Sequence, residues 1–298
     1  GIMKRQHVIG ILVFISVLLL LTGCQQGRFE DSSTQIIDYH TGTQGITAYF
    51  IDQAPPQSLY EQTSFDVQAQ IRNEGAFSLY PQDNEEGEKY SMDVAFKYDS
   101  SAVQWNENRV FINDDLNKIT LEGRSLTFPD GESKDLMLGS FMAKNIRGNF
   151  ETDSGEFTLS YCYPYKTQFS ETVCVDTNIQ GNDARSQVCN ARDHSYSGGQ
   201  GAPVEITAVE NSIVPFGNYV KPQFTIHIRQ NGEGYVANWN VKEKDDGTKT
   251  CSDVNETNVN IVSVKARLAN DSLECVPEQV RLKDGEAKVQ CQLADSDI

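Results

Sequence analysis

The thiols of seven cysteines have the clearest capacity for covalent chemistry in this chain. Cys24 follows an apolar run, and the other six lie far downstream: Cys162, Cys174, Cys189, Cys251, Cys275 and Cys291. An even number of downstream cysteines in an exported chain predicts up to three disulfides formed outside the cytoplasm. A zinc site is the alternative, but zinc favours cysteines two to four residues apart, and none of these is that close to another.

Spacing suggests some cysteine pairings and leaves others open, because six cysteines allow 15 pairings. Cys275 and Cys291 flank the turn-forming stretch LKDGE. This symmetry predicts that the two face each other across a hairpin. Cys174 has two candidate partners: Cys162, placed symmetrically about a shared centre, and Cys189, which would close a polar loop.

The histidines are the next candidates for chemistry, as acid–base groups or metal ligands. They are His7, His40, His194 and His227. Only His227 lies in a predicted strand, where alternation with two isoleucines places it on the solvent face. The chain carries no zinc-protease, nucleophile-elbow, P-loop or dinucleotide-binding motif. We expect no catalysis, cofactor or metal, although a β-scaffold hydrolase stays an alternative because a glycosidase needs only two well-placed carboxylates.

Acidic turns and two Asn-x-Ser/Thr triplets are the remaining polar candidates. The densest acidic run is 83–88, with smaller ones at 113–115 and 245–247. None has the spacing of an EF-hand loop, so solvated turns are expected there rather than Ca²⁺ sites. Asn255 and Asn270 begin glycosylation acceptor triplets, which would be used if the host glycosylates exported proteins.

Three tyrosines alternate along one short stretch: Tyr161, Tyr163 and Tyr165. In a strand, residues two apart share a face, so these side chains are predicted to line one surface. An exposed surface of this kind would favour recognition of a partner. A packed sheet or domain interface is the other interpretation.

The N-terminus has the layout of an export signal, with Lys4 and Arg5 before a long apolar run. The tetrapeptide LTGC, residues 21–24, resembles the lipobox of prokaryotic lipoproteins. The resemblance implies that Cys24 receives lipid and that the protein is a lipoprotein anchored on the extracytoplasmic face of the cell membrane. A retained anchor helix and plain secretion are the alternatives, and both also place the remaining chain outside the cytoplasm.

The charge of the chain restricts its partners. Its 42 acidic residues exceed its 25 lysines and arginines, giving a net charge of −17. Nucleic acids are bound mainly by cationic side chains that neutralise phosphate, so this acidic chain is not expected to bind them.

Short alternating runs separated by turn-forming residues predict antiparallel strands from residue 45 onward. The expected strands in the first half are 46–52, 65–71, 92–98, 110–112, 125–128, 135–143 and 156–163. Those in the second half are 204–210, 223–229, 235–241, 259–267, 278–282 and 287–293. Half-buried strands of this kind bury one face by packing sheet against sheet, so the fold class is all-β with two tandem β-sandwiches.

Composition divides the chain into segments. Residues 1–23 form the signal peptide or membrane anchor helix, and the polar residues 24–44 form a flexible tether. Sandwich domains are predicted at 45–194 and 204–298, joined by the glycine-rich linker 195–203. Each domain then holds three of the downstream cysteines, so either one bond crosses the domain boundary or each domain keeps a free thiol. A bond from Cys251 to the first domain is the preferred alternative.

A partial internal repeat supports the tandem arrangement. The stretches 54–76 and 214–234 share one order of features: a proline-containing segment, then an alternating strand, then an Ile-Arg pair and an Asn/Gly turn. This layout resembles Ig-like and CARDB-like modules of prokaryotic surface proteins. The stretches CYPYKT (162–167) and GQGAPVEIT (199–207), with the NGEG turn, also resemble archaeal cell-surface proteins, a resemblance that implies no activity.

These observations predict a membrane-anchored, extracytoplasmic binding or structural protein that acts in adhesion or cell-envelope contact, without catalysis. The expected partners are the membrane and an unidentified protein or glycan at the cell surface. A filament subunit, assembled through the N-terminal segment or by exchange of residues 30–52 with a neighbouring copy, is the alternative, and a homo-oligomer is compatible with either.

Overall fold

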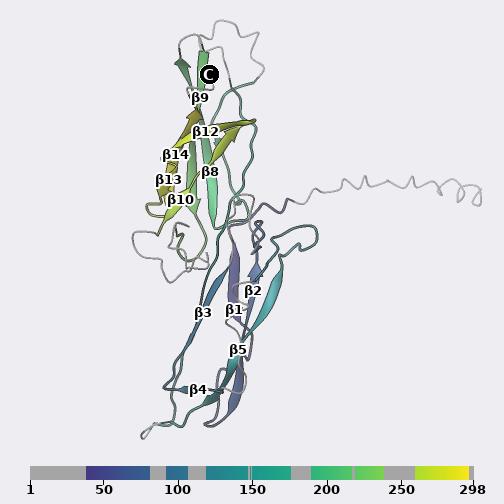
Figure 1. The fold of residues 1–298 in the computed structure, drawn as a ribbon, viewed down its shortest axis with the longest axis vertical. Helices are drawn as coiled ribbons and strands as arrows, with labels where there is room; N and C mark the ends of the chain where they lie inside the picture. Colours follow the sequence, from purple (N-terminus) through teal and green to yellow (C-terminus); the bar gives the residue numbers. More distant parts are fainter. Residues whose placement is uncertain are drawn as a thin grey trace, which may run out of the picture. The chain divides into compact units, whose positions relative to one another are not determined.

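The computed structural model describes residues 38–80, 92–106, 119–146, 148, 150–175, 189–216, 219–237 and 259–294. All the described strands lie in the compact unit Tyr39–Ile298. No helix occurs among the described residues, and every strand pairing is antiparallel (Figure 1). The all-β fold class is therefore confirmed.

The first group of strands, β1–β6, is called the N-terminal sheet region. Its four-stranded sheet has the order β1-β2-β5-β4. The bounds are β1 Ile46–Phe50, β2 Ser64–Asn73, β5 Ser133–Ala143 and β4 Val103–Trp105. A separate pair joins β3 (Asp93–Tyr98) to β6 (Phe157–Cys162).

Alternation in β2 creates the core of this region. Phe65, Val67, Ala69 and Ile71 are buried, and the residues between them are half-buried, as a period of two requires. Side chains from β3 and β6 pack against the same core. Phe157 of β6 meets Phe141 of β5 edge to face, with ring centroids 5.5 Å apart. The two-stranded sheet thus covers the apolar face of the four-stranded one.

The second group, β7–β14, is called the C-terminal sheet region. Its six-stranded sheet has the order β11-β12-β14-β9-β8-β7, drawn in green and yellow in Figure 1. The bounds are β7 His194–Ser195, β8 Val204–Phe216, β9 Tyr219–Gln230, β11 Ala266–Leu268, β12 Asp271–Val276 and β14 Glu286–Leu293. A further pair joins β10 (Ile261–Ser263) to β13 (Gln279–Arg281).

The C-terminal sheet region has its own core. Ile226, Ile228, Val289 and Cys291 of the large sheet are buried together with Leu282, which follows β13. Val262 and Val280 of the β10–β13 pair pack against them. Two separate clusters of buried side chains therefore stabilise the two regions.

Several predicted strands differ from those observed. The stretch 125–128 is a turn, in which the Ser125 amide donates to the Phe128 carbonyl at 2.9 Å and Leu126 stays 84% exposed. The predicted strand 259–267 is interrupted between β10 and β11, and β12 was not predicted. The predicted strand 110–112 lies outside the described residues, as do residues 238–241 of the predicted strand 235–241.

The predicted linker 195–203 is tied into the fold by hydrogen bonds. Its first residue belongs to β7, which pairs with β8. The Gly42 amide donates to the Gly198 carbonyl, and the Gly201 amide donates to the Gly42 carbonyl at 2.8 Å. The Ala76 amide donates to the Gly201 carbonyl at 2.7 Å. These bonds hold the segment in place at several points.

Candidate binding site

Cys275 and Cys291 are register partners in β12 and β14 and form a disulfide, with Cα atoms 4.0 Å apart. The symmetric spacing around the LKDGE turn predicted this opposition, which is confirmed. The bond lies at the edge of the C-terminal core, where Cys291 is fully buried. It therefore joins two neighbouring strands of the large sheet covalently.

Cys174 is bonded to Cys189, with Cα atoms 5.9 Å apart. The polar-loop alternative is therefore confirmed, and the pairing of Cys174 with Cys162 is wrong. Cys162 is itself disulfide-bonded. Cys24 and Cys251 lie outside the described residues, so lipidation of Cys24 and the bond from Cys251 to the first domain stay predictions.

The three histidines that the structure describes do not converge on one site. His227 of β9 lies on the face opposite its buried neighbours, where its Nε2 is 2.6 Å from Oε1 of Glu210. Its side chain is only 22% exposed, so it is more enclosed than a solvent-facing position implies. His194 was placed outside any strand, but it lies in β7 and stacks on Tyr196. His7 lies outside the described residues.

Other candidate residues are divided between described and undescribed parts of the chain. Asn270 is exposed in the turn between β11 and β12, a position open to modification. Asn255 and the acidic runs 83–88, 113–115 and 245–247 lie outside the described residues. In the described part, no group of three or more metal-ligating side chains converges.

The three alternating tyrosines, one in β6 and two after it, pack beside β1, which is an edge strand of its sheet. Tyr161 stacks on Tyr163 at 6.2 Å, and Tyr163 meets Tyr165 edge to face at 5.6 Å. The hydroxyls of Tyr161 and Tyr163 are hydrogen-bonded to the backbone of Ala48 and Ile46 in β1. Backbone groups at a sheet edge otherwise stay open to another strand, so these hydroxyls satisfy part of that edge.

Burial alters the acidity of these tyrosines. Desolvation raises the pKa of Tyr163 to about 12, and the hydrogen bond from the Ile46 backbone lowers it only in part. Desolvation likewise raises the pKa of Tyr161 and Tyr165 above the ordinary tyrosine value. The tyrosine cluster is thus packed against the sheet, as the interpretation of these tyrosines as part of a packed sheet or domain interface predicted.

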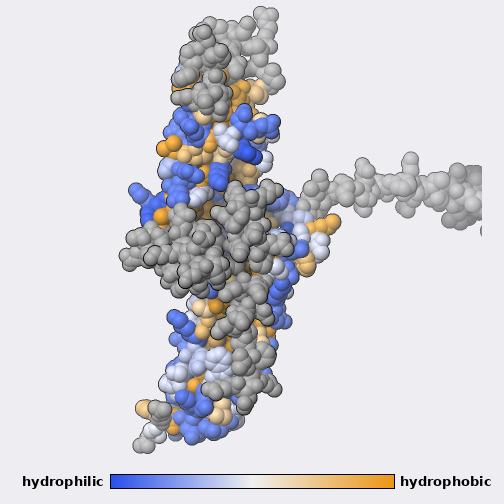
Figure 2. Space-filling model, in the orientation of Figure 1, coloured by the Kyte–Doolittle hydropathy of each residue, from blue (hydrophilic) through white to orange (hydrophobic). Residues whose placement is uncertain are grey.

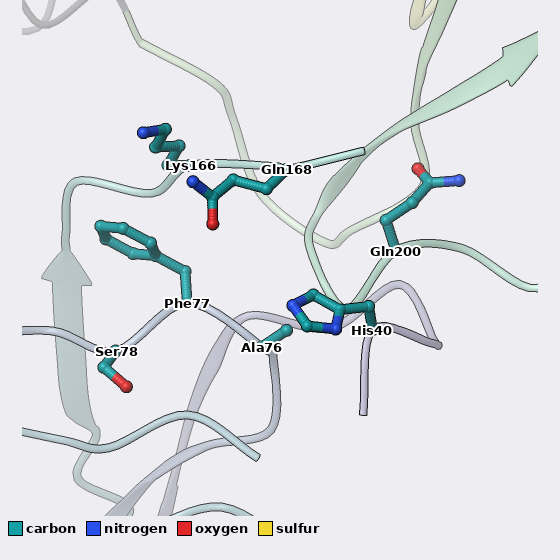
Figure 3. A pocket seen from close by; sticks show the side chains of 7 residues that line it. All are labelled: His40, Ala76, Phe77, Ser78, Lys166, Gln168 and Gln200. Atoms are coloured by element: carbon teal, nitrogen blue, oxygen red, sulfur yellow. The ribbon is translucent and has the colours of Figure 1, made fainter. Parts of the chain in front are cut away.

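A pocket of about 130 Å³ lies next to this tyrosine cluster (Figure 3). Its wall comes from four separate stretches: His40, residues 76–78 after β2, Lys166 with Gln168 after β6, and Gln200. Figure 3 shows the His40 ring near Ala76, and the amide of Gln168 above it, between the Phe77 ring and Gln200. We call this the His40–Lys166 pocket.

Hydrogen bonds set the shape of the pocket wall. The side-chain amide of Gln200 accepts from the Ile206 amide at 2.8 Å and donates to the Ile206 carbonyl at 3.1 Å, so its polar atoms are already engaged. Ser78 Oγ accepts from the Gly123 amide at 3.0 Å. The Phe77 ring meets Tyr165 edge to face at 5.6 Å. The wall is therefore held by contacts that need no ligand.

The sequence did not predict this pocket, because its residues carry no motif. Two stretches noted for their resemblance to archaeal surface proteins each supply one wall residue: CYPYKT supplies Lys166 and GQGAPVEIT supplies Gln200. Their meeting depends on long-range pairing. A single sequence does not show such pairing, so only the two stretches themselves were available as a signal.

The described surface mixes polar and apolar residues, as the blue and orange areas of Figure 2 show. Tyr60, Leu126 and Tyr235 are each more than four-fifths exposed and come from distant parts of the sequence. Within the described residues there is no helix long and apolar enough to cross a bilayer, and the apolar run before Cys24 is not among them.

Comparisons of this chain with protein families, with curated proteins and with solved structures found no match.

Proposed function

We propose that this protein is a membrane-anchored, extracytoplasmic binding or structural protein of a cell surface, acting in adhesion or cell-envelope contact without catalysis. Lipid on Cys24, or the apolar segment before it, would hold the chain at the membrane. The polar tether after Cys24 would carry the two sheet regions away from the lipid surface. Their partner would be a protein or glycan of the surface.

The observation that carries this proposal is the presence of disulfides within the fold. Cys174–Cys189 and Cys275–Cys291 are bonded in the structure. Such bonds form and persist in oxidising compartments and are rare in the cytosol, where thiols are kept reduced. This favours export and agrees with the basic and then apolar N-terminus.

The described architecture also supports the proposal. Each sheet region packs a two-stranded sheet and a larger antiparallel sheet around one core. We interpret the two regions as tandem Ig-like sandwiches of the CARDB-like type, which present loops and sheet faces to partners. An Ig-like assignment predicts that each region folds as a unit, with its own unfolding transition.

The first test is the intact mass of the protein extracted from its native membrane, with mapping of its N-terminal peptide. A chain that begins at Cys24 and carries added lipid mass supports the lipoprotein proposal. A chain that keeps residues 8–23 refutes it and leaves the retained anchor. A Cys24→Ser variant is the matched control: it should lack the lipid mass and keep its leader.

Surface exposure is tested on intact cells. A membrane-impermeant amine reagent should label lysines of both sheet regions, such as Lys97 and Lys283, before lysis. Labelling only after lysis would contradict an extracytoplasmic location. A cytoplasmic protein of the same host, followed in the same experiment, shows whether the cells stayed closed.

A further inference from the structure

The His40–Lys166 pocket differs in charge from the chain that contains it. The chain carries 42 acidic residues against 25 lysines and arginines, yet the pocket wall includes Lys166 and His40 and no aspartate or glutamate. A cation in a concave site attracts anions locally even where the whole surface is negative. The pocket is therefore suited to receive a negatively charged group.

A second cation, Arg124, holds the stretch that carries His40. Arg124 donates a hydrogen bond to the Tyr39 carbonyl at 2.9 Å and another to the Thr41 carbonyl. These two carbonyls flank His40 in the chain, so the guanidinium fixes the stretch that presents the imidazole. It also adds positive charge beside the site without occupying it.

Two polar groups of the wall are available to a ligand. In the described part of the structure, neither the Lys166 ammonium nor the Gln168 side-chain amide has a hydrogen-bond partner. Both residues are exposed at the rim. Ser78 accepts one bond through its oxygen, so its hydroxyl proton can still be donated. An ammonium, an amide and a hydroxyl together suit a carboxylate that carries neighbouring hydroxyl groups.

Part of the pocket wall is apolar and fixed. Ala76 and Phe77 form it, and the Phe77 ring is held against Tyr165. The Phe77 amide donates to the Tyr165 hydroxyl at 3.3 Å, which holds the backbone as well. A wall that combines apolar and polar groups matches a ligand whose ring carries both C–H groups and hydroxyls.

We infer that the His40–Lys166 pocket binds the carboxylate-bearing end of an acidic sugar, a uronic acid residue of a surface glycan. Lys166 pairs with the carboxylate, Gln168 and Ser78 hydrogen-bond the hydroxyls, and Phe77 covers the ring face. The volume of about 130 Å³ suits one terminal sugar group and not a long stretch of polymer. This assignment rests on the proposed function, because it names the partner of a surface protein.

The test is an NMR titration of the full chain in detergent with D-galacturonate and D-glucuronate. The neutral counterparts D-galactose and D-glucose, and acetate as a carboxylate without a sugar, are titrated in parallel. We expect a uronate to bind at least about tenfold more tightly than its neutral counterpart and than acetate, because a hydrogen bond to a charged group contributes more than a neutral one. Equal binding of uronate and neutral sugar, equal binding of uronate and acetate, or no uronate binding overturns the inference.

Variants locate the binding. Lys166→Gln should weaken uronate binding about tenfold or more, and Gln168→Ala should weaken it by a smaller factor. Lys97→Gln is the matched control, since Lys97 is an exposed lysine on β3 and the charge change is the same. An unchanged affinity in Lys166→Gln, or an equal loss in Lys97→Gln, overturns the assignment.

The result for uronate binding can be distinguished from the result for the proposed membrane-anchored function. Unfolding midpoints of the variants show whether each is folded, and neither rim side chain has a partner whose loss would unfold the chain. A lipid-bearing Cys24 without uronate binding would refute the ligand alone. Uronate binding by a chain without a membrane anchor would refute the anchoring alone.

Discussion

The hydroxyl of Tyr165 donates a hydrogen bond to the carbonyl of Gly201 across 3.1 Å, joining two segments 36 residues apart. The same carbonyl accepts the Ala76 amide, and the same hydroxyl accepts the Phe77 amide. One side chain thus ties the loop after β2, the stretch after β6 and the segment before β8 to each other. These are the stretches that supply most of the pocket wall.

Tyr165→Phe should lower the free energy of unfolding by about 1–2 kcal/mol. The ring would still pack against Phe77, but the phenylalanine could neither donate to Gly201 nor accept from the Phe77 amide. Urea denaturation followed by intrinsic fluorescence measures the change. Tyr235→Phe serves as the control, because Tyr235 is 85% exposed and its loss should be neutral. Equal effects of the two substitutions would show that these hydrogen bonds contribute nothing to stability.

Gly131→Ala should destabilise the N-terminal sheet region more than Gly198→Ala does. Both glycines have positive φ, 81° and 93°, so an added Cβ introduces backbone strain of roughly 1 kcal/mol at either position. At Gly131 that Cβ would also collide with the backbone carbonyl of Asn73, a fully buried residue, whereas at Gly198 nothing lies within 4 Å. Thermal melts of the two variants measure the difference, and equal melting temperatures would contradict it.

Much of the fold followed from local patterns. The alternation of β2 and β9 marks a buried face, and period-two burial is a local property that a sequence displays directly. The stretch 125–128 misled because its Leu and Phe look like strand residues. Two hydrogen bonds close it as a turn: the Ser125 amide donates to the Phe128 carbonyl, and the Phe128 amide donates to Ser125 Oγ. Both bonds depend on the backbone conformation around them.

The pocket could not be predicted from a single sequence, for another reason. His40 and Lys166 are more than a hundred residues apart, and they line one pocket because long-range hydrogen bonds hold the stretches around them, several of which go to the segment at Gly198–Gly201. Neither residue type in isolation indicates a site. The cysteines were more informative, because the turn between Cys275 and Cys291 is itself readable and fixes which residues oppose.

Alkaline pH should destabilise the protein through its buried tyrosines. Tyr163 has a folded-state pKa of about 12 against the ordinary value of 10.0, so between these values the unfolded chain loses a proton that the folded chain keeps. Stability is therefore complete below pH 10 and falls between pH 10 and 12, by about 2–3 kcal/mol from this residue. Urea unfolding at a series of pH values measures the slope, and Tyr163→Phe should reduce it. A slope that is unchanged in that variant would refute the assignment to Tyr163.

Removing the disulfide between β12 and β14 should cost roughly 3 kcal/mol of stability, as expected for a closed loop with a sequence separation of 16. The double variant Cys275→Ala/Cys291→Ala isolates this bond, and guanidinium unfolding measures the loss. Cys174→Ala/Cys189→Ala is the comparison: its loop is of nearly equal length, with a separation of 15, but Cys174 lies outside the two cores. The chain-entropy account predicts similar losses for the two pairs. A much larger loss for Cys275–Cys291 would instead indicate that packing of the fully buried Cys291 contributes beyond the constraint on the unfolded chain.

The remaining disulfide offers a test of how the two sheet regions are joined. Cys162 is bonded, and Cys174, Cys189, Cys275 and Cys291 are paired among themselves. If Cys24 carries lipid, elimination leaves Cys251, and we expect a non-reducing digest to yield a peptide pair containing Cys162 and Cys251. Reduction should separate that pair and shift its mass by two hydrogens. Such a bond would limit the motion of one region against the other, because Cys162 ends β6 and Cys251 lies between β9 and β10 in the chain. Recovery of Cys251 as a free thiol, alkylated without prior reduction, would contradict the expectation and require another partner for Cys162.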